Sequence, residues 1–145
     1  MKIAIGCDHA GVELKNELIT LLKNEQIDVI NFGTDNNDSV DYPDFAKKVA
    51  SSIKKNEVDR GILICGTGIG MSIAANRYKG IRAALCHDIF TAQMSRLHND
   101  SNVLVIGSRI VDIFTAEKIV KIWLCTEFEG GRHDNRLCKI RDIED

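Results

Sequence analysis

Residues 62–76 combine a cysteine, three glycines and the start of a helical pattern. The apolar run Gly61–Cys65 ends in a cysteine, and Gly66, Gly68 and Gly70 follow at alternate positions. Alternating glycines allow several backbone N–H groups to approach one point, which forms an anion-binding site when a helix begins there. The spacing matches neither the dinucleotide fingerprint G-x-G-x-x-G nor the P-loop pattern. The segment is therefore either a site for a smaller anion or a tight strand-to-helix turn.

Cys65 stands at the mouth of this loop. Amide donors and a helix start favour the thiolate form of a neighbouring cysteine. Cys65 could therefore act as a nucleophile or as a general base. The alternative is a buried, inert thiol that serves only as a small apolar side chain.

Other polar side chains follow the predicted strands and helices. Asp8 and His9 come directly after the first strand, where they fit either an acid–base or binding role or a helix start with a surface histidine. His98 and Asn99 lie between the fourth helix and the fifth strand, where ordinary turn chemistry also explains them. Arg109 follows the fifth strand and is either a ligand contact or a solvated side chain.

Arg132 and Arg136 follow two consecutive glycines near the end of the chain. Residues four apart share one face of a helix, so the two guanidinium groups would point the same way. Such a pair matches the geometry of a phosphate group. The alternative is a solvated helix whose charges form surface ion pairs.

An alternation of strand and helix patterns surrounds these residues. The predicted strands are Lys2–Gly6, Asp28–Phe32, Gly61–Cys65, Ile81–Cys86 and Asn102–Ile106. The predicted helices are Val12–Lys23, one that starts at Pro43, Gly70–Asn76, Ile89–His98, Asp112–Cys125 and a polar one from about His133 to about Ile143. The third and fifth strands are continuous apolar runs, typical of a parallel sheet covered on both faces. We therefore predict one α/β domain over residues 1–145, a three-layer sandwich whose ligands bind beyond the carboxyl ends of the strands.

Charge and cysteine usage exclude several classes of protein. The net charge of −2 and the pI near 6.1 argue against a nucleic-acid-binding protein, which usually carries a basic face. No apolar run approaches the roughly 18 residues that span a membrane, and the N-terminus does not read as a signal peptide. The five cysteines are odd in number and form no C-x-x-C pair. They indicate reduced thiols in a cytoplasmic protein.

Seven segments together resemble one known family. They are GCDHAG (6–11), DYP (41–43), GILICGTGIGMSIAAN (61–76), GIRAA (80–84), HNDSNVL (98–104), GSR (107–109) and EGGRHDNR (129–136). In this order, and over essentially the whole chain, they are similar to ribose-5-phosphate isomerases of the B type. That family also includes galactose-6-phosphate isomerase subunits and allose-6-phosphate isomerases.

The resemblance implies an activity, an assembly and a set of site residues. The expected reaction interconverts an aldose phosphate and a ketose phosphate through an enediolate, without metal or cofactor. The expected fold is Rossmann-like with five parallel strands and a C-terminal helix, and the expected assembly is a homodimer or tetramer with active sites shared between subunits. Cys65 would move the proton between C1 and C2, and His98 would help to open the sugar ring. The remaining expected site residues are Thr67 beside the enediolate oxygens, the backbone amides of Gly66, Gly68, Ile69 and Gly70 around them, Asp8 and Asn99 for sugar hydroxyls, Tyr42 in the pocket wall, and His9, Arg109, Arg132 and Arg136 for phosphate.

Two alternatives to a ribose 5-phosphate isomerase remain. One is a hexose-6-phosphate isomerase of the same chemistry, acting on allose or galactose 6-phosphate. The other is a phosphate-binding module without catalysis. Cys65 favours the ribose type, because family members without this cysteine are typically the companion subunit of the galactose system.

Overall fold

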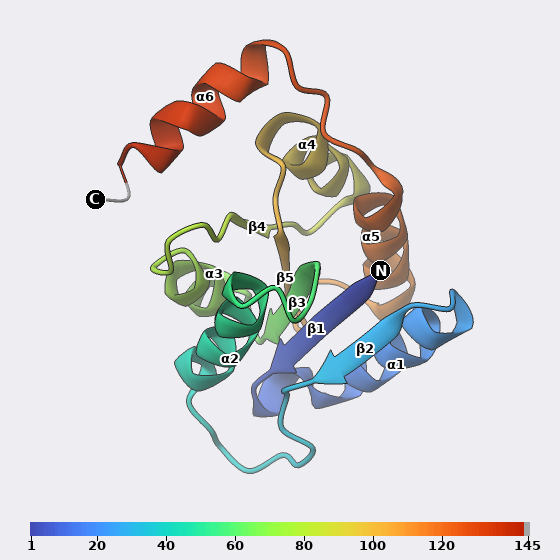
Figure 1. The fold of residues 1–145 in the computed structure, drawn as a ribbon. Coiled ribbons are helices and arrows are strands. Elements are labelled where there is room, and N and C mark those ends of the chain that lie inside the picture. Colours follow the sequence, from blue (N-terminus) through green and yellow to red (C-terminus); the bar gives the residue numbers. More distant parts are fainter. Residues whose placement is uncertain (144–145) are drawn as a thin grey trace.

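A five-stranded sheet lies at the centre of the protein (Figure 1). The computed structural model describes residues 1–143, so residues 144 and 145 of the predicted domain lie outside the described residues. The strands are β1 (Lys2–Cys7), β2 (Asp28–Asn31), β3 (Arg60–Cys65), β4 (Ala83–Leu85) and β5 (Val103–Gly107), in the spatial order β2-β1-β3-β5-β4. Every neighbouring pair is parallel, which confirms the predicted class of fold.

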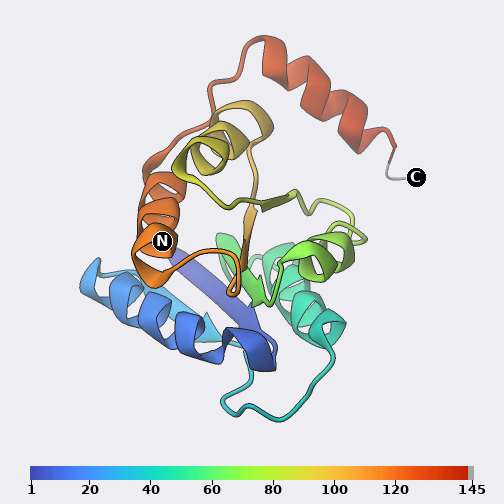
Figure 2. The same cartoon turned by 180° about the vertical axis from the view of Figure 1, so that it is seen from behind.

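Helices cover both faces of the sheet, as the two opposite views show (Figures 1 and 2). Side chains of α1 (Val12–Asn24), α4 (Ile89–Asn99) and α5 (Ile113–Cys125) contribute to the core on one face. Those of α2 (Tyr42–Lys54) and α3 (Ile69–Ala75) fill the core on the other. A short 3-10 helix, η1 (His9–Gly11), joins β1 to α1, and α6 (Arg132–Arg141) stands away from the sheet beside α4. Among residues 1–143, no helix has the length and apolar character needed to cross a membrane.

The apolar runs that predicted buried strands occupy the middle of the sheet. All five residues of β5 are buried, and so are all residues of β3 except Arg60. Because side chains alternate between the two faces of a strand, Ile62 and Ile64 enter one core and Leu63 and Cys65 enter the other. Burial on both faces explains why neither strand shows polar alternation.

Two element boundaries differ from the prediction in ways that matter for the site. The fourth strand is shorter than predicted, because Ile81 closes a turn onto Tyr78 and the Arg82 N–H donates to the side chain of Asn102. His98 and Asn99 belong to the last turn of α4 and not to a loop. That helix ends at Asn99, one residue further than predicted, and its C-cap Asp100 adopts a left-handed conformation with φ 43°.

Candidate active site

Three loops meet at the carboxyl edge of the sheet, after β1, β3 and β5. The Ser108 N–H donates to the Cys65 carbonyl at 2.9 Å, and the Ser108 hydroxyl donates to the Ala10 carbonyl at 2.8 Å. The Arg109 N–H donates to the Gly66 carbonyl at 3.0 Å, and the Asp8 N–H donates to the Ile64 carbonyl at 3.2 Å. These bonds hold the segments around Asp8, Cys65 and Arg109 in one fixed arrangement.

The glycine loop directs a backbone donor at the sulfur of Cys65. The Gly68 N–H donates to Cys65 Sγ at 3.2 Å, and the Ile69 N–H donates to Thr67 Oγ1 at 3.3 Å. Gly68 has φ +79°, which L-residues other than glycine rarely adopt, and a Cβ there would lie 2.4 Å from Leu85 Cδ1. The segment is thus a tight turn, and the same turn points an amide at a buried thiol.

The other buried cysteines lie in a different environment. Burial raises the pKa of the Cys7 thiol to about 11, and burial also raises the pKa of Cys86. Both thiols are therefore protonated at neutral pH. Cys7 and Cys86 are buried side chains of the core, whereas Cys125 and Cys138 are exposed.

Asp8 and His9 are held at the end of β1 by local hydrogen bonds. The buried Asp8 carboxylate accepts the Ala10 N–H at 2.9 Å and so caps η1. His9 Nδ1 accepts the Val40 N–H at 3.3 Å. A ring nitrogen that accepts a bond carries no proton, so in neutral His9 the proton is on Nε2, which is then a donor for a ligand.

Arg109 and Tyr42 enclose the glycine loop. A Cβ on Gly66 would lie 3.4 Å from Arg109 Cζ, so the guanidinium group is in van der Waals reach of the loop backbone. A Cβ on Gly70 would lie 2.5 Å from Tyr42 Cζ, which means that the phenol ring lies directly on this glycine. The carboxyl edge therefore brings together the predicted residues Asp8, His9, Tyr42, Cys65, Gly66, Thr67, Gly68, Ile69, Gly70 and Arg109.

The remaining four predicted residues lie at the opposite edge of the sheet. The α4 helix starts after the carboxyl end of β4 and runs 11 residues, or about 16 Å, back to the amino edge. His98 and Asn99 end this helix, and α6 carries Arg132 and Arg136 beside it (Figure 2). One chain alone does not bring these four side chains to Cys65.

Two residues that the sequence did not single out complete this second group. The rings of His98 and His133 stack with their centroids 4.3 Å apart and their planes 12° apart. Glu129 Oε2 lies 3.8 Å from Nε2 of His98 and 3.6 Å from that of His133. His133 is buried, and its Nδ1 lies 3.3 Å from Arg136 Nη1. Burial, with the nearby His98 and arginine charges, lowers the pKa of His133. Glu129 lies before α6, so its spacing from His133 is not that of a helical pair, and no local pattern of the sequence indicates this contact.

These three side chains are poorly arranged for a metal ion. The potential ligand atoms of His98, Glu129 and His133 lie within 4.8 Å of one another. Imidazole binds a metal through a lone pair in the plane of its ring. Because the two rings are stacked and nearly parallel, their lone pairs do not converge on a single ion.

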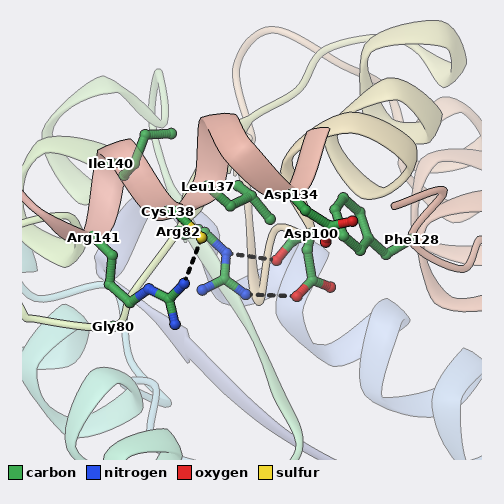
Figure 3. Close-up of a pocket in the computed structure, with 9 residues that line it drawn as sticks. All are labelled: Gly80, Arg82, Asp100, Phe128, Asp134, Leu137, Cys138, Ile140 and Arg141. Carbon is green, nitrogen blue, oxygen red and sulfur yellow. Dashed lines mark hydrogen bonds and ion pairs between the residues drawn. The ribbon is translucent and has the colours of Figure 1, made fainter. Parts of the chain in front are cut away.

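A partly buried network of charged side chains fixes the end of α4 next to His98. The carboxylate of Asp100 accepts from Arg96 Nη1 at 2.7 Å and from Arg82 Nη2 at 2.8 Å. The Arg96 side chain is 4% exposed and also donates to the carbonyls of Ser101 and Thr126. A cavity of about 280 Å³ separates α6 from the Arg82–Asp100 pair (Figure 3). Its lining contains none of the predicted site residues, so we give it no part in the candidate site.

Comparison with known proteins points to one family. The family model described as Ribose/Galactose Isomerase matches residues 3–140. Ribose-5-phosphate isomerase B of Escherichia coli is 50% identical over 99% of this chain and 96% of its own length. The structure of ribose-5-phosphate isomerase B from Clostridium thermocellum has a TM-score of 0.98 at 56% identity, covering 99% of this chain and 97% of that one. The enzyme from Mycoplasma genitalium with bound ribulose-5-phosphate has a TM-score of 0.95 at 45% identity, covering 99% and 95%.

Proposed function

The chain belongs to the ribose/galactose isomerase family, and from this we infer that it is an aldose–ketose isomerase that interconverts ribose 5-phosphate and ribulose 5-phosphate. The observation that carries the inference is the loop Cys65–Gly70, in which a backbone amide points at a buried thiol beside Arg109. The single domain, residues 1–145, needs no metal or cofactor in this proposal. Five free cysteines suit a reducing compartment, so we assign the enzyme to the cytoplasm.

Cys65 is the base in the proposed reaction. The hydrogen beside a carbonyl group is only weakly acidic, so the site must supply a base and also stabilise the developing enediolate. The Cys65 thiolate removes the proton from C2 and returns it to C1, and the hydroxyl proton of O2 passes to O1, so that the aldehyde becomes a ketone. Amides of Gly66–Gly70 donate to the enediolate oxygens, with Thr67 beside them. The Gly68 amide, which contacts Sγ in the free protein, supports the negative charge of the thiolate.

The other predicted residues open the sugar ring and hold the phosphate. Sugar phosphates are mostly closed rings, and His98 transfers the proton that opens them. Asp8 and Asn99 bind hydroxyl groups, and Tyr42 forms one wall of the pocket. The phosphate is held by His9, Arg109, Arg132 and Arg136. Binding energy from this remote group positions C1 and C2 for proton transfer.

A complete site in this proposal needs two chains. Cys65 lies at the carboxyl edge of the sheet, whereas His98 and both α6 arginines lie at the amino edge. Large apolar side chains are exposed on or just before the three helices that follow β3, β4 and β5, namely Ile69, Ile73, Ile89, Phe90, Ile110 and Phe114. An exposed apolar surface of this kind fits contact with a second copy of the chain. We therefore propose a homodimer or tetramer in which the α4 end and α6 of one chain face Cys65 of another.

Subunit mixing tests the roles of Cys65 and His98 and also whether two chains share each active site. Cys65→Ala and His98→Ala should each lose turnover of ribose 5-phosphate. When the two variants are unfolded, mixed and refolded, activity should return to about a quarter of the wild-type value. Half of the random dimers are then mixed, and one of the two sites in each carries neither substitution. Mixed dimers that form, as seen by native mass spectrometry, but remain inactive would rule out a shared site.

The wild-type assay separates the proposed function from its alternatives. Turnover of ribose 5-phosphate should be unchanged by a chelator, and kcat/KM should exceed that for allose 6-phosphate. One extra hydroxymethyl group changes the free energy of transition-state binding by only a few kcal/mol. The two substrates must therefore compete in one assay, which compares their kcat/KM values directly. Turnover of the hexose phosphate alone would favour the hexose-6-phosphate isomerase. Binding without any turnover would favour a phosphate-binding module.

A further inference from the structure

Lys15 in α1 is a fully buried lysine. Its side chain is 0% exposed, although it belongs to the polar run Lys-Asn-Glu of the sequence. Taking an ammonium group out of water is costly unless the charge is paired and hydrogen-bonded. The partners of the buried Lys15 ammonium group therefore indicate why this residue is a lysine.

Lys15 holds the start of the loop that follows β2. Its Nζ donates to the Thr34 carbonyl at 2.7 Å and to Asp35 Oδ1 at 2.5 Å. The hydrogen bond and the charge of Lys15 lower the pKa of Asp35, whose own side chain is 80% exposed. A Cβ on Gly33 would lie 2.8 Å from Lys15 Cδ, so the loop backbone lies directly on the lysine stem.

The same loop, Gly33–Asp41, leads to two predicted substrate contacts. In Figure 1 it is the cyan segment between β2 and α2. Near its end, the Val40 N–H donates to His9 Nδ1 and so sets the ring orientation of His9. Tyr42 follows directly, and its ring lies on Gly70. The loop is thus held by Lys15 at one end and supports both site residues at the other.

We propose that Lys15 is a positioning residue for substrate binding, which acts by holding Thr34 and Asp35 so that loop Gly33–Asp41 keeps His9 and Tyr42 in place. Its hydrogen bonds go to Thr34 and Asp35, neither of which is a predicted substrate ligand. This inference rests on the proposed function, in which His9 binds the phosphate group. It adds that the affinity for the phosphate group also depends on Lys15, a residue outside the site.

Asp35 offers a test that removes no buried side chain, because its own side chain is exposed. Asp35→Ala should raise KM for ribose 5-phosphate and Ki for inorganic phosphate together, by about fivefold or more, while kcat stays within about twofold. Asp35→Glu retains a carboxylate and should restore both constants. Asp38→Ala is the matched control, since Asp38 is exposed on the same loop and its carboxylate has no bonding partner among residues 1–143. Lys15→Met should give the same rise in KM as Asp35→Ala.

Amide hydrogen exchange measures the loop without relying on turnover. In Asp35→Ala, the amides of Thr34 and Val40 should exchange faster than in the wild type, whereas in Asp38→Ala they should not. Unchanged exchange in Asp35→Ala, or a fall in kcat with KM unchanged, would overturn the role of Lys15. A wild-type protein without isomerase activity would refute the proposed function alone, and the exchange rates would still decide whether Lys15 holds the loop.

Discussion

Gly68→Ala should destabilise the protein through two separable effects. The first is conformational, because an L-residue in the left-handed region, here at φ +79°, costs about 1–2 kcal/mol. The second is steric. The new Cβ would lie 2.4 Å from Leu85 Cδ1 and 3.2 Å from the Gly107 nitrogen, and overpacking of this kind costs about 1–3 kcal/mol. The expected loss is therefore about 2–5 kcal/mol of the free energy of unfolding.

Gly80→Ala isolates the conformational part. Gly80 has φ +84°, and a Cβ there would meet no heavy atom of residues 1–143 within 4 Å. Its expected loss is about 1–2 kcal/mol. Both substitutions remove the same backbone freedom from the unfolded chain, so that contribution cancels when the two are compared. The difference between them measures the contact with Leu85 and Gly107.

Urea unfolding at one fixed protein concentration gives both free energies, since association would otherwise shift the apparent stability. Gly68→Ala should also lose turnover, because the Gly68 N–H would no longer point at Cys65 Sγ. Gly80→Ala should keep its turnover. Equal losses of stability in the two variants would refute the steric reasoning. Full activity in Gly68→Ala would refute the role given to the loop geometry.

Three further predictions concern the pocket wall, the α4 end and pH. Gly70→Ala should displace the Tyr42 ring, which would lie 2.5 Å from the new Cβ. An enzyme assay should then find a higher KM, while urea unfolding should show a loss of less than about 1 kcal/mol in the free energy of unfolding. Asp100→Asn removes the charge paired with buried Arg96 and should lower the free energy of unfolding in urea by about 1.5–3 kcal/mol. An unchanged urea midpoint would contradict a stabilising role of this network. His133 has a lowered pKa in the folded protein, so the unfolded chain binds the extra proton more readily, and stability should fall as pH drops below about 6.5. His133→Phe should flatten this part of the stability profile between pH 7 and 5, and an identical slope in the variant would disprove the assignment.

Local patterns were sufficient to predict the sheet and its carboxyl edge. The apolar runs at β3 and β5 indicated burial on both faces, and the structure bears this out. Once parallel strands are identified, the residues that follow them must meet at one edge. Asp8, Cys65 and Arg109 were found in this way, although they are far apart in the sequence.

Features that depend on contacts between distant segments could not be read from local patterns. Lys15 resembles a solvated helix residue until the loop after β2 folds onto it. The stacking of His133 on His98 requires α6 to lie beside α4. The late start of the fourth strand, at Ala83, depends on a hydrogen bond from Arg82 to the Asn102 side chain. In each case the partner lies 17 or more residues away, outside the window of any helical or strand pattern.

Because the Cys7 thiol is buried, its rate of alkylation reports how often loop Gly33–Asp41 opens. Cys7 Sγ donates to the Thr34 carbonyl, and its raised pKa leaves little thiolate to react with an alkylating reagent while the loop is closed. Cys125 and Cys138 are exposed on α5 and α6 and should be alkylated first. A time course of Cys7 labelling, followed by mass spectrometry, would therefore measure the rate at which the loop opens, without an engineered probe.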